Sequence, residues 1–397
     1  MTHTSARRPW YRPMVARHPD EPHRASTPLE LFFDLCFVVA VAQAAAQLHH
    51  DVAEDHIGHA VPSFLMVFFA IWWAWMNFTW FASAYDTDDD VYRITTLVQV
   101  TGALVLAAGV PRAFVDSDFS LITYGYVLMR LAMVVQWLRV ARTDVHPGRR
   151  AAGRRYAIAI TLVQIGWVLR LVLPIPDGWL IPAFVLLALA ELAVPIWAER
   201  ITQTTWHPEH IAERYGLFTI IVLGESILAA SLAVQSAVDE HKALGGLLWV
   251  AGTGVVIVFG MWWLYFDRPA SQLLTSMRVG LFWGYGHYLI FASAAAVGAG
   301  LAVAVDYETH KAHLGGVAAG YAVAVPVAVY LFSVWLLHVR PHQRGMIVAA
   351  YPVAAALVLL APLTPARVPV VALVVAALVA VTVVATHLER RTAVGAG

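Results

Sequence analysis

The chain has 397 residues, of which 60% are hydrophobic and 13% charged, and its mean hydropathy is +0.67. Soluble domains are about 45–50% apolar and about 25% charged, so this composition excludes an ordinary soluble protein and predicts a membrane protein. The 26 basic and 26 acidic residues balance. This balance argues against a nucleic-acid-binding protein. The single cysteine, Cys36, excludes a disulfide framework within the chain.

The two ends of the chain are polar. Residues 1–28 carry five arginines, and the apolar stretch that follows keeps its charges and lacks a small-residue cleavage pattern. We therefore expect a retained cytoplasmic basic tail over 1–28 rather than a cleaved signal peptide. Residues 388–397 are expected to form a second cytoplasmic tail.

Apolar runs long enough to cross a bilayer recur along the rest of the chain. A spanning helix needs about 20 predominantly apolar residues. Twelve candidate spans meet this criterion, at 30–48, 62–84, 93–113, 121–138, 156–173, 179–197, 213–236, 245–266, 279–304, 314–338, 346–362 and 367–387. The predicted fold is an all-α polytopic membrane protein with about twelve transmembrane helices.

The distribution of basic residues predicts an orientation. With twelve spans, 20 of the 26 Lys and Arg residues fall on the side of the two termini, four on the opposite side and two within spans. Cytoplasmic loops carry the excess of Lys and Arg. The count therefore predicts an even number of helices with both termini in the cytoplasm.

Two similar landmarks suggest an internal duplication. Glu30 opens the first predicted helix and Glu213 the seventh, 183 residues apart, and the helices that follow end at Asp86 and Asp267, 181 residues apart. These offsets predict two parallel six-helix halves, 29–205 and 206–387, with a functional path at their interface. The alternative is that aromatic-rich helix ends simply recur at membrane interfaces.

Five ionisable residues lie inside predicted spans, where a charge costs at least about 2.5–3.5 kcal/mol and is usually paired or functional. They are Asp34, Arg130, Arg170, Glu191 and Glu225. We expect a carboxylate or backbone carbonyls to meet Arg130, which lies midway along its helix. Two interpretations stay open: an Arg–Glu pair that fixes helix packing, or a carboxylate that forms a proton or cation site. In the second, Asp34 and Glu225 are the site carboxylates, and Arg130 and Arg170 are counter-charges or contacts for an anionic substrate.

The first predicted helix carries several polar side chains. Glu30 and Asp34 are four residues apart and share one face near the cytoplasmic end. Capping of the helix N-terminus is the favoured role for Glu30, whereas Asp34 is expected to be buried and hydrogen-bonded, in a structural or pore-associated role. Gln43 points to the opposite side, so this helix offers polar contacts in two directions.

Other polar or aromatic features have structural explanations. His287 lies among glycines and is expected either to titrate or to pack with a hydrogen bond to a neighbouring helix. The acidic turn 86–90 favours helix capping over calcium binding. Tryptophans near helix ends, among them Trp73 and Trp75, are expected to be interfacial anchors. We find no metal-ligand spacing, nucleotide-binding motif or hydrolase motif, so we expect no cofactor, no metal and no enzymatic activity.

Four segments together resemble the bacterial low temperature requirement A family. They are 29–38, 85–89, 213–226 and 262–267, and the likeness covers nearly the whole chain from about 26 to 387. The motif of the second half contains Glu213, Arg214, Glu225 and Ser226. The resemblance implies a multi-pass protein of the bacterial inner membrane that is associated with growth in the cold.

A second resemblance concerns the first helix alone. Residues 32–41 are similar to the Phe-Ser-Asp motif that opens the pore-lining helix of a family of non-classical potassium channels, with Phe33 in the place of the motif's serine. The second half has no corresponding aspartate. The resemblance implies helix-packing and gate-associated roles for Phe32, Asp34 and Phe37.

The predicted function follows from these features. We expect the protein to mediate or regulate passage of a small ion or solute across the inner membrane. The alternative is a non-transporting membrane scaffold or sensor that supports growth at low temperature. The expected partners are the lipid bilayer and the passing ion or solute, without nucleic acid. The sequence leaves the oligomeric state open, a homo-oligomer included.

Overall fold

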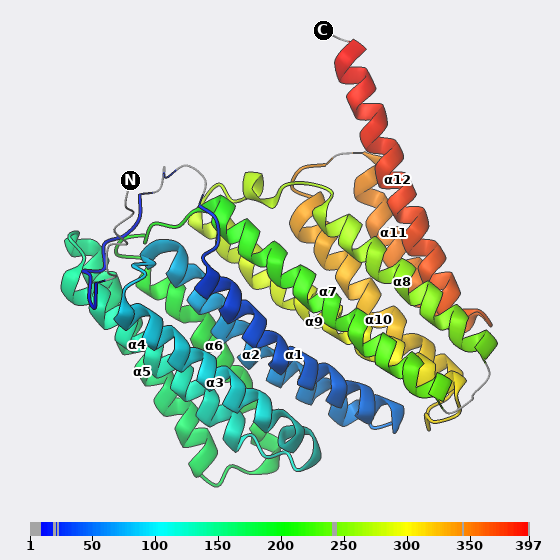
Figure 1. The fold of residues 1–397 in the computed structure, drawn as a ribbon, viewed down its shortest axis with the longest axis horizontal. Coiled ribbons are helices and arrows are strands. Elements are labelled where there is room, and N and C mark those ends of the chain that lie inside the picture. The colour runs from blue at the N-terminus through cyan, green and yellow to red at the C-terminus, as the bar shows by residue number, and fades with distance from the viewer. Residues whose placement is uncertain (1–8, 19–20, 22–23, 240–243, 344, 396–397) are drawn as a thin grey trace, which may run out of the picture. The chain divides into compact units, whose positions relative to one another are not determined.

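The computed structural model describes residues 9–18, 21, 24–239, 244–343 and 345–395, and within these ranges it contains helices and no strands (Figure 1). The α-helices are α1 (Pro28–Ala53), α2 (Ile57–Tyr85), α3 (Asp90–Val115), α4 (Ser120–Thr143), α5 (Pro147–Val172), α6 (Asp177–Ala198), α7 (Pro208–Asp239), α8 (Leu244–Phe266), α9 (Met277–Glu308), α10 (Gly316–Val334), α11 (Met346–Leu360) and α12 (Arg367–Gly395). Arg7, Arg8, Lys242 and Arg344, which entered the charge count, lie outside the described residues.

All twelve of these helices are long and apolar enough to cross a membrane, which confirms the predicted fold class. Each expected span falls on one helix. The largest difference is at α5, which begins at Pro147 rather than near 156. His146 caps this start by accepting a hydrogen bond from the backbone N–H of Gly148 at 3.2 Å. The arginine-rich first turns are helical but polar, so an apolar window cannot detect them.

The chain forms two compact units. Unit 1 comprises residues 1–43 and 66–214, and unit 2 comprises residues 44–65 and 215–397. Helices α1, α2 and α7 therefore each contribute residues to both units. The predicted six-helix halves, 29–205 and 206–387, differ from these units in their boundaries, and their common origin stays a prediction.

In unit 1, helices α3 to α6 pack each against the next in chain order (Figure 1). Helices α3 and α4 are in backbone contact, because a Cβ added at Gly125 would collide with the carbonyl oxygen of Gly102. Glycine at such a crossing lets helices approach closely. Farther along α4, Trp137 stacks on Tyr156 of α5 with ring centroids 3.9 Å apart. These contacts pack α3, α4 and α5 closely against one another in unit 1.

In unit 2, helix α9 is the most buried of the membrane-spanning helices. Of the residues in its apolar 18-residue stretch, 83% are buried inside the structure. Helix α10 packs on α9 and α11, and α12 packs on α8 and α11. Helix α10 continues into a π-helical turn, Trp335–Val339. Such turns often mark functional positions, and this one places His338 in the interior.

The N-terminal segment, described over 9–18, 21 and 24–27, is ordered without being helical. The backbone N–H of Met14 donates to Thr143 Oγ1 at 2.8 Å, and that of Arg17 donates to the carbonyl of Ala84 at 2.9 Å. Met14 itself is fully buried. The predicted basic tail therefore packs on the helix ends of unit 1, and we call its described part the N-terminal strap.

Candidate functional site

Helix α1 begins with a capping box. Thr27 precedes the helix, Pro28 is its first residue, and Glu30 Oε2 accepts hydrogen bonds from the backbone N–H of Thr27 at 2.8 Å and from its hydroxyl at 3.1 Å. The sequence Thr-x-x-Glu satisfies N–H groups that a helix leaves unpaired, and proline suits the first helical position. One oxygen of Glu30 thus serves the capping role expected from the sequence.

One turn deeper, Asp34 forms a two-pronged ion pair with Arg214 of α7. Arg214 Nε lies 2.9 Å from Asp34 Oδ2, and Arg214 Nη2 lies 2.5 Å from Asp34 Oδ1. The indole N–H of Trp75 on α2 also donates to Asp34 Oδ1, at 2.6 Å. The side chains of Asp34 and Arg214 are fully buried. Arg214, rather than Arg130 or Arg170, is therefore the counter-charge of Asp34.

The second oxygen of Glu30 meets three nitrogen-bearing side chains. Arg24 Nη2 and His210 Nε2 each lie 3.1 Å from Glu30 Oε1, and Arg214 Nη1 lies 3.3 Å from it. Arg24 comes from the N-terminal strap, so a loop residue completes a cluster built on α1 and α7. We call Arg24, Glu30, Asp34, His210 and Arg214 the α1 charge cluster. All five belong to unit 1 and are at most 5% exposed.

A second buried network surrounds Glu191 of α6. Its carboxylate accepts hydrogen bonds from Arg130 Nη2 at 2.7 Å, the Tyr126 hydroxyl at 2.7 Å, Gln164 Nε2 at 2.8 Å and Trp73 Nε1 at 3.0 Å. We call these five residues the Glu191 network. The carboxylate that we expected to meet Arg130 is Glu191, and four donors from three other helices, α2, α4 and α5, hold it in place.

Helix α2 lies between the two carboxylates. Trp73 donates to Glu191 and Trp75 donates to Asp34. Residues two apart on a helix are separated by about 200° and point to nearly opposite sides. Both indoles are fully buried. The interfacial-anchor interpretation of these two tryptophans is therefore wrong, because both are buried and their N–H groups donate hydrogen bonds to buried carboxylates.

Comparison with known proteins gives the family. The family model described as bacterial low temperature requirement A protein (LtrA) matches residues 25–385. The chain belongs to the LtrA family. An uncharacterized protein of Rhizobium meliloti is 26% identical over 309 residues, which cover 72% of this chain and 71% of that protein. No solved structure matches the chain.

The matched region of this LtrA protein begins at Ala25, just before the capping box. It includes the Glu191 network and all of the α1 charge cluster except Arg24. The other residues of the second-half motif lie in different surroundings. Glu213 is exposed and accepts from the backbone N–H of Ser26 at 3.4 Å. The Ser226 hydroxyl donates to the carbonyl of Ala294 at 2.8 Å, which joins α7 to α9. Glu225 is half-buried, and no ion pair or hydrogen bond of its side chain is found within the described residues.

The remaining predicted positions divide between buried and exposed. Phe37 is buried, whereas Phe32 is 47% exposed, and Phe33 takes the packed position with its ring 4.0 Å from that of Phe78. Gln43 is exposed. Of the phenylalanines in the channel-like segment 32–41, Phe33 and Phe37 therefore pack inside the structure and Phe32 does not.

Arg170 lies in the last turn of α5. Its Nη2 donates to the carbonyl of Leu180 at 3.3 Å, and its guanidinium lies 5.7 Å from the ring of Phe184 and 5.8 Å from that of Phe119. Cation–π contacts of this kind are attractive. Arg170 is thus placed among aromatic rings and away from the Asp34 carboxylate that it was expected to serve.

His287 of α9 lies in an aromatic cluster of unit 2. Its Nε2 is 2.9 Å from the Tyr265 hydroxyl of α8, its Nδ1 is 2.7 Å from the carbonyl of Trp283, and its ring centroid is 5.5 Å from that of His338. The contact with Tyr265 is a hydrogen bond to a neighbouring helix, as the packing interpretation of His287 predicts.

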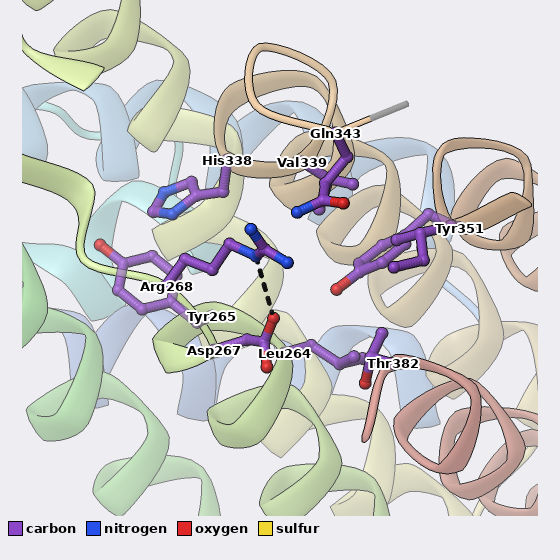
Figure 2. Close-up of a pocket in the computed structure, with 10 residues that line it drawn as sticks. Leu264, Tyr265, Asp267, Arg268, His338, Val339, Gln343, Tyr351 and Thr382 are labelled. Carbon is purple, nitrogen blue, oxygen red and sulfur yellow. Dashed lines mark ion pairs between the residues drawn. The ribbon is translucent and has the colours of Figure 1, made fainter. Parts of the chain in front are cut away.

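A small polar cavity borders this cluster (Figure 2). Figure 2 shows Arg268 between Asp267 and Gln343, with the Tyr351 hydroxyl turned toward the same space. The guanidinium lies 3.6 Å from the Asp267 carboxylate. The cavity volume of about 20 Å³ is enough for roughly one water molecule. It is too small for an organic solute.

Asp86 links the α1 charge cluster to the loop between α2 and α3. Its side chain is 4% exposed and lies 3.6 Å from the Arg24 guanidinium. Burial, and then the nearby Glu30 carboxylate, raises the pKa of Asp86 to about 6, against the opposing effect of Arg24. Asp88, the other charged group nearby, also raises it. The pKa of Asp86 is therefore closer to neutral pH than that of an ordinary aspartate.

This raised pKa predicts a pH-dependent stability. The folded Asp86 carboxyl binds its proton more tightly than the unfolded one, so its stabilising effect is complete below about pH 4 and is lost as the pH rises through 6. Relative to Asp86→Asn, the wild type should lose about 2–3 kcal/mol of unfolding free energy across this window. Denaturant unfolding of the purified protein in detergent, at a series of pH values, measures this difference.

The control is Asp116→Asn, which changes an exposed acid of the same unit. It should keep the wild-type pH dependence. Equal slopes for the wild type and Asp86→Asn would contradict the assignment of the titration to Asp86.

Proposed function

We propose that this LtrA protein mediates or regulates passage of a small ion or solute across the bacterial inner membrane, without enzymatic activity. Both termini face the cytoplasm in this proposal, which the 20 to 4 distribution of Lys and Arg supports. The α1 charge cluster then lies at the cytoplasmic side, at the start of the first helix.

One observation carries the proposal. Glu30 and Asp34 are buried one turn apart on one helix and share the single guanidinium of Arg214. Buried ion pairs recover their desolvation cost poorly, and apolar side chains of similar volume often give a more stable protein. Ionisable groups kept inside membrane segments commonly mark ion or solute pathways. Arg214 can exchange partners between the two acids, which gives α1 two electrostatic states.

The proposal assigns Asp34 to the switching pair, with Arg24 of the strap holding Glu30 while Arg214 is engaged by Asp34. Protonation or cation binding at Asp34 would release Arg214 toward Glu30. Trp75 holds the position of the Asp34 carboxylate through its indole N–H. Passage of the solute is then linked to the charge state of this pair.

Flux measurements test this proposal. Purified protein in liposomes should conduct at least one of potassium, sodium, protons and chloride, and Asp34→Asn should reduce that flux at least tenfold, because the amide cannot form the charged pair. Circular dichroism and size-exclusion chromatography establish that the variant is folded. Glu225→Gln is the matched control within a span, since its side chain has no ion pair to lose among the described residues.

Absence of flux for all four ions in the wild type would contradict ion passage. Unchanged flux in a folded Asp34→Asn protein would contradict the role of this carboxylate. Loss of flux in Glu225→Gln with Asp34→Asn unaffected would move the site to Glu225.

A non-transporting membrane scaffold or sensor that supports growth at low temperature is the second candidate. The Glu191 network favours it, because four donors satisfy the carboxylate and leave it no freedom to bind an ion. Such a site fixes α2, α4, α5 and α6 in place. On this proposal, folded variants of both networks keep the family's function in cold growth, and flux is absent.

A further inference from the structure

A cavity of about 380 Å³ lies within unit 2, at the end where α10 and α12 begin and α9 finishes. Its walls include Trp249 of α8, Ala304 and Tyr307 of α9, Gly316 of α10 and Arg367 of α12. Small-molecule sites have volumes of about 300–1,000 Å³ and combine apolar walls with a few polar groups. This cavity has both properties, and neither carboxylate network contributes to it.

Arg367 is the cation of this cavity. Its guanidinium lies 5.8 Å from the ring of Tyr307, and its Nε is buried without a hydrogen-bond partner. Within the described residues no carboxylate pairs with it, and Glu308, which also borders the cavity, is exposed to solvent. A buried donor without a partner is costly and is normally satisfied by a ligand or a water. The site therefore presents an unpaired positive charge beside apolar walls.

Two glycines of α10 make room for this guanidinium. A Cβ added at Gly316 would lie 2.8 Å from Arg367 Cζ and 2.5 Å from the Tyr307 hydroxyl, and a Cβ added at Gly320 would lie 3.1 Å from Arg367 Cδ. Both residues are one turn apart on one face of the helix. Any larger side chain there would displace the cation.

The N-terminus of α10 adds to the positive potential. Gly315 caps the helix without a side-chain hydrogen bond, so the first backbone N–H groups of α10 depend on water or a ligand. The start of a helix also carries a partial positive charge that favours anions. Arg367 is itself the first residue of α12, so two helix N-termini border the cavity.

We propose that this cavity binds an amphiphile that carries a phosphate or carboxylate on an apolar chain. The anionic group is held by Arg367 and the start of α10, and the chain lies along Trp249, Ala304 and Val368. Trp249 is 69% exposed, which suits a tryptophan at a membrane interface. The amphiphile comes either from the bilayer, as an anionic phospholipid, or from solution.

Binding measurements on the full chain in a neutral detergent test the proposal. One probe is dioleoylphosphatidylglycerol, followed by native mass spectrometry, and the other is decanoate, followed by calorimetric titration. The wild type should bind at least one probe, and Arg367→Met should weaken that binding at least tenfold. Arg367→Lys should retain most of it, because the positive charge remains. The control, Arg112→Met, changes an exposed arginine of unit 1 and should leave binding unchanged.

The outcomes of these measurements identify the source of the amphiphile or overturn the proposal. Binding of the phospholipid alone assigns the bilayer as the source, and binding of decanoate alone assigns a soluble amphiphile. Equal affinity for decanoate and uncharged decanol, unchanged binding by folded Arg367→Met, or no binding of either probe would overturn the proposal. None of these outcomes depends on ion flux, so this test is independent of the proposed transport function.

Discussion

Replacing Arg214 with methionine is expected to lower the unfolding free energy by about 3–5 kcal/mol, the usual effect of removing one partner from a buried ion pair. Among the described residues, the Asp34 carboxylate would keep only the Trp75 indole as a hydrogen-bond donor. Glu30 would rely on Thr27, Arg24 and His210. Denaturant unfolding in detergent micelles measures the change. Arg200→Met, which replaces an exposed arginine of the same unit, should alter stability by less than about 0.5 kcal/mol.

A double variant tests whether Arg214→Met loses stability because it leaves the Asp34 charge unpaired or because its side chain is smaller. Asp34→Leu combined with Arg214→Met removes both charges and leaves apolar side chains, so it should recover most of the stability that Arg214→Met loses. Equal stability of Arg214→Met and the double variant would contradict this expected recovery. The same double variant should have no flux, because the switching pair is absent.

Replacing Glu191 with leucine is expected to be at least as damaging, by about 3–5 kcal/mol. The Arg130 guanidinium would remain fully buried without a counter-charge, and the Tyr126 hydroxyl, the Trp73 indole and the Gln164 amide would each lose an acceptor. Loss of folded protein, measured as the monodisperse fraction after extraction, gives a first reading. Denaturant unfolding of the surviving fraction gives the free energy.

The companion variant is Arg130→Met with Glu191→Leu, which should be closer to wild-type stability than Glu191→Leu alone, although three donors still lack their acceptor. Glu225→Gln is the matched single change within a span and should have a small effect. A mild phenotype for Glu191→Leu would mean that Arg130 finds another partner, and it would remove the structural role assigned to this network.

The helices were predictable because the signal for a membrane span is local. Twenty consecutive apolar residues identify a span wherever the rest of the chain lies, and each expected span matches one helix of the structure. The errors in the predicted helix boundaries are largest where a helix is longer than its apolar, membrane-spanning segment. Helix α5 begins nine residues before its expected start. The arginines of these first turns are good helix formers, but they are too polar to be counted in an apolar segment.

The candidate site was predictable only in part. Burial of Asp34 and the capping role of Glu30 follow from their positions on α1, and Arg130 required a counter-charge. The partner of Asp34 did not follow, because Arg214 is 180 residues away and lies close enough to a helix start to be counted with the cytoplasmic charges. Which side chains pair with each other depends on the tertiary structure, and hydropathy along the sequence contains no information about it.

The N-terminal strap was also missed. Its proline- and arginine-rich sequence has no helical or strand period, so hydrophobic periodicity does not predict a folded position for it. Two local features of the sequence pointed to structure in this region. One is the apolar Met14 in a polar segment, and the other is the Thr27-x-x-Glu30 pattern, which is typical of a helix start. Neither reveals that Arg24 reaches the buried Glu30 and Asp86.

The distance in sequence between Asp34 and Arg214 bears on how the protein is made. Synthesis at about 5–20 residues per second puts roughly 10–35 s between the emergence of Asp34 and that of Arg214, 180 residues later. During this interval the two acids of α1 exist without their main cation. Arg24, made six residues before Glu30, is already present and can accompany α1 until α7 arrives. The strap thus provides an early counter-charge for the nascent chain, before the final ion pair exists.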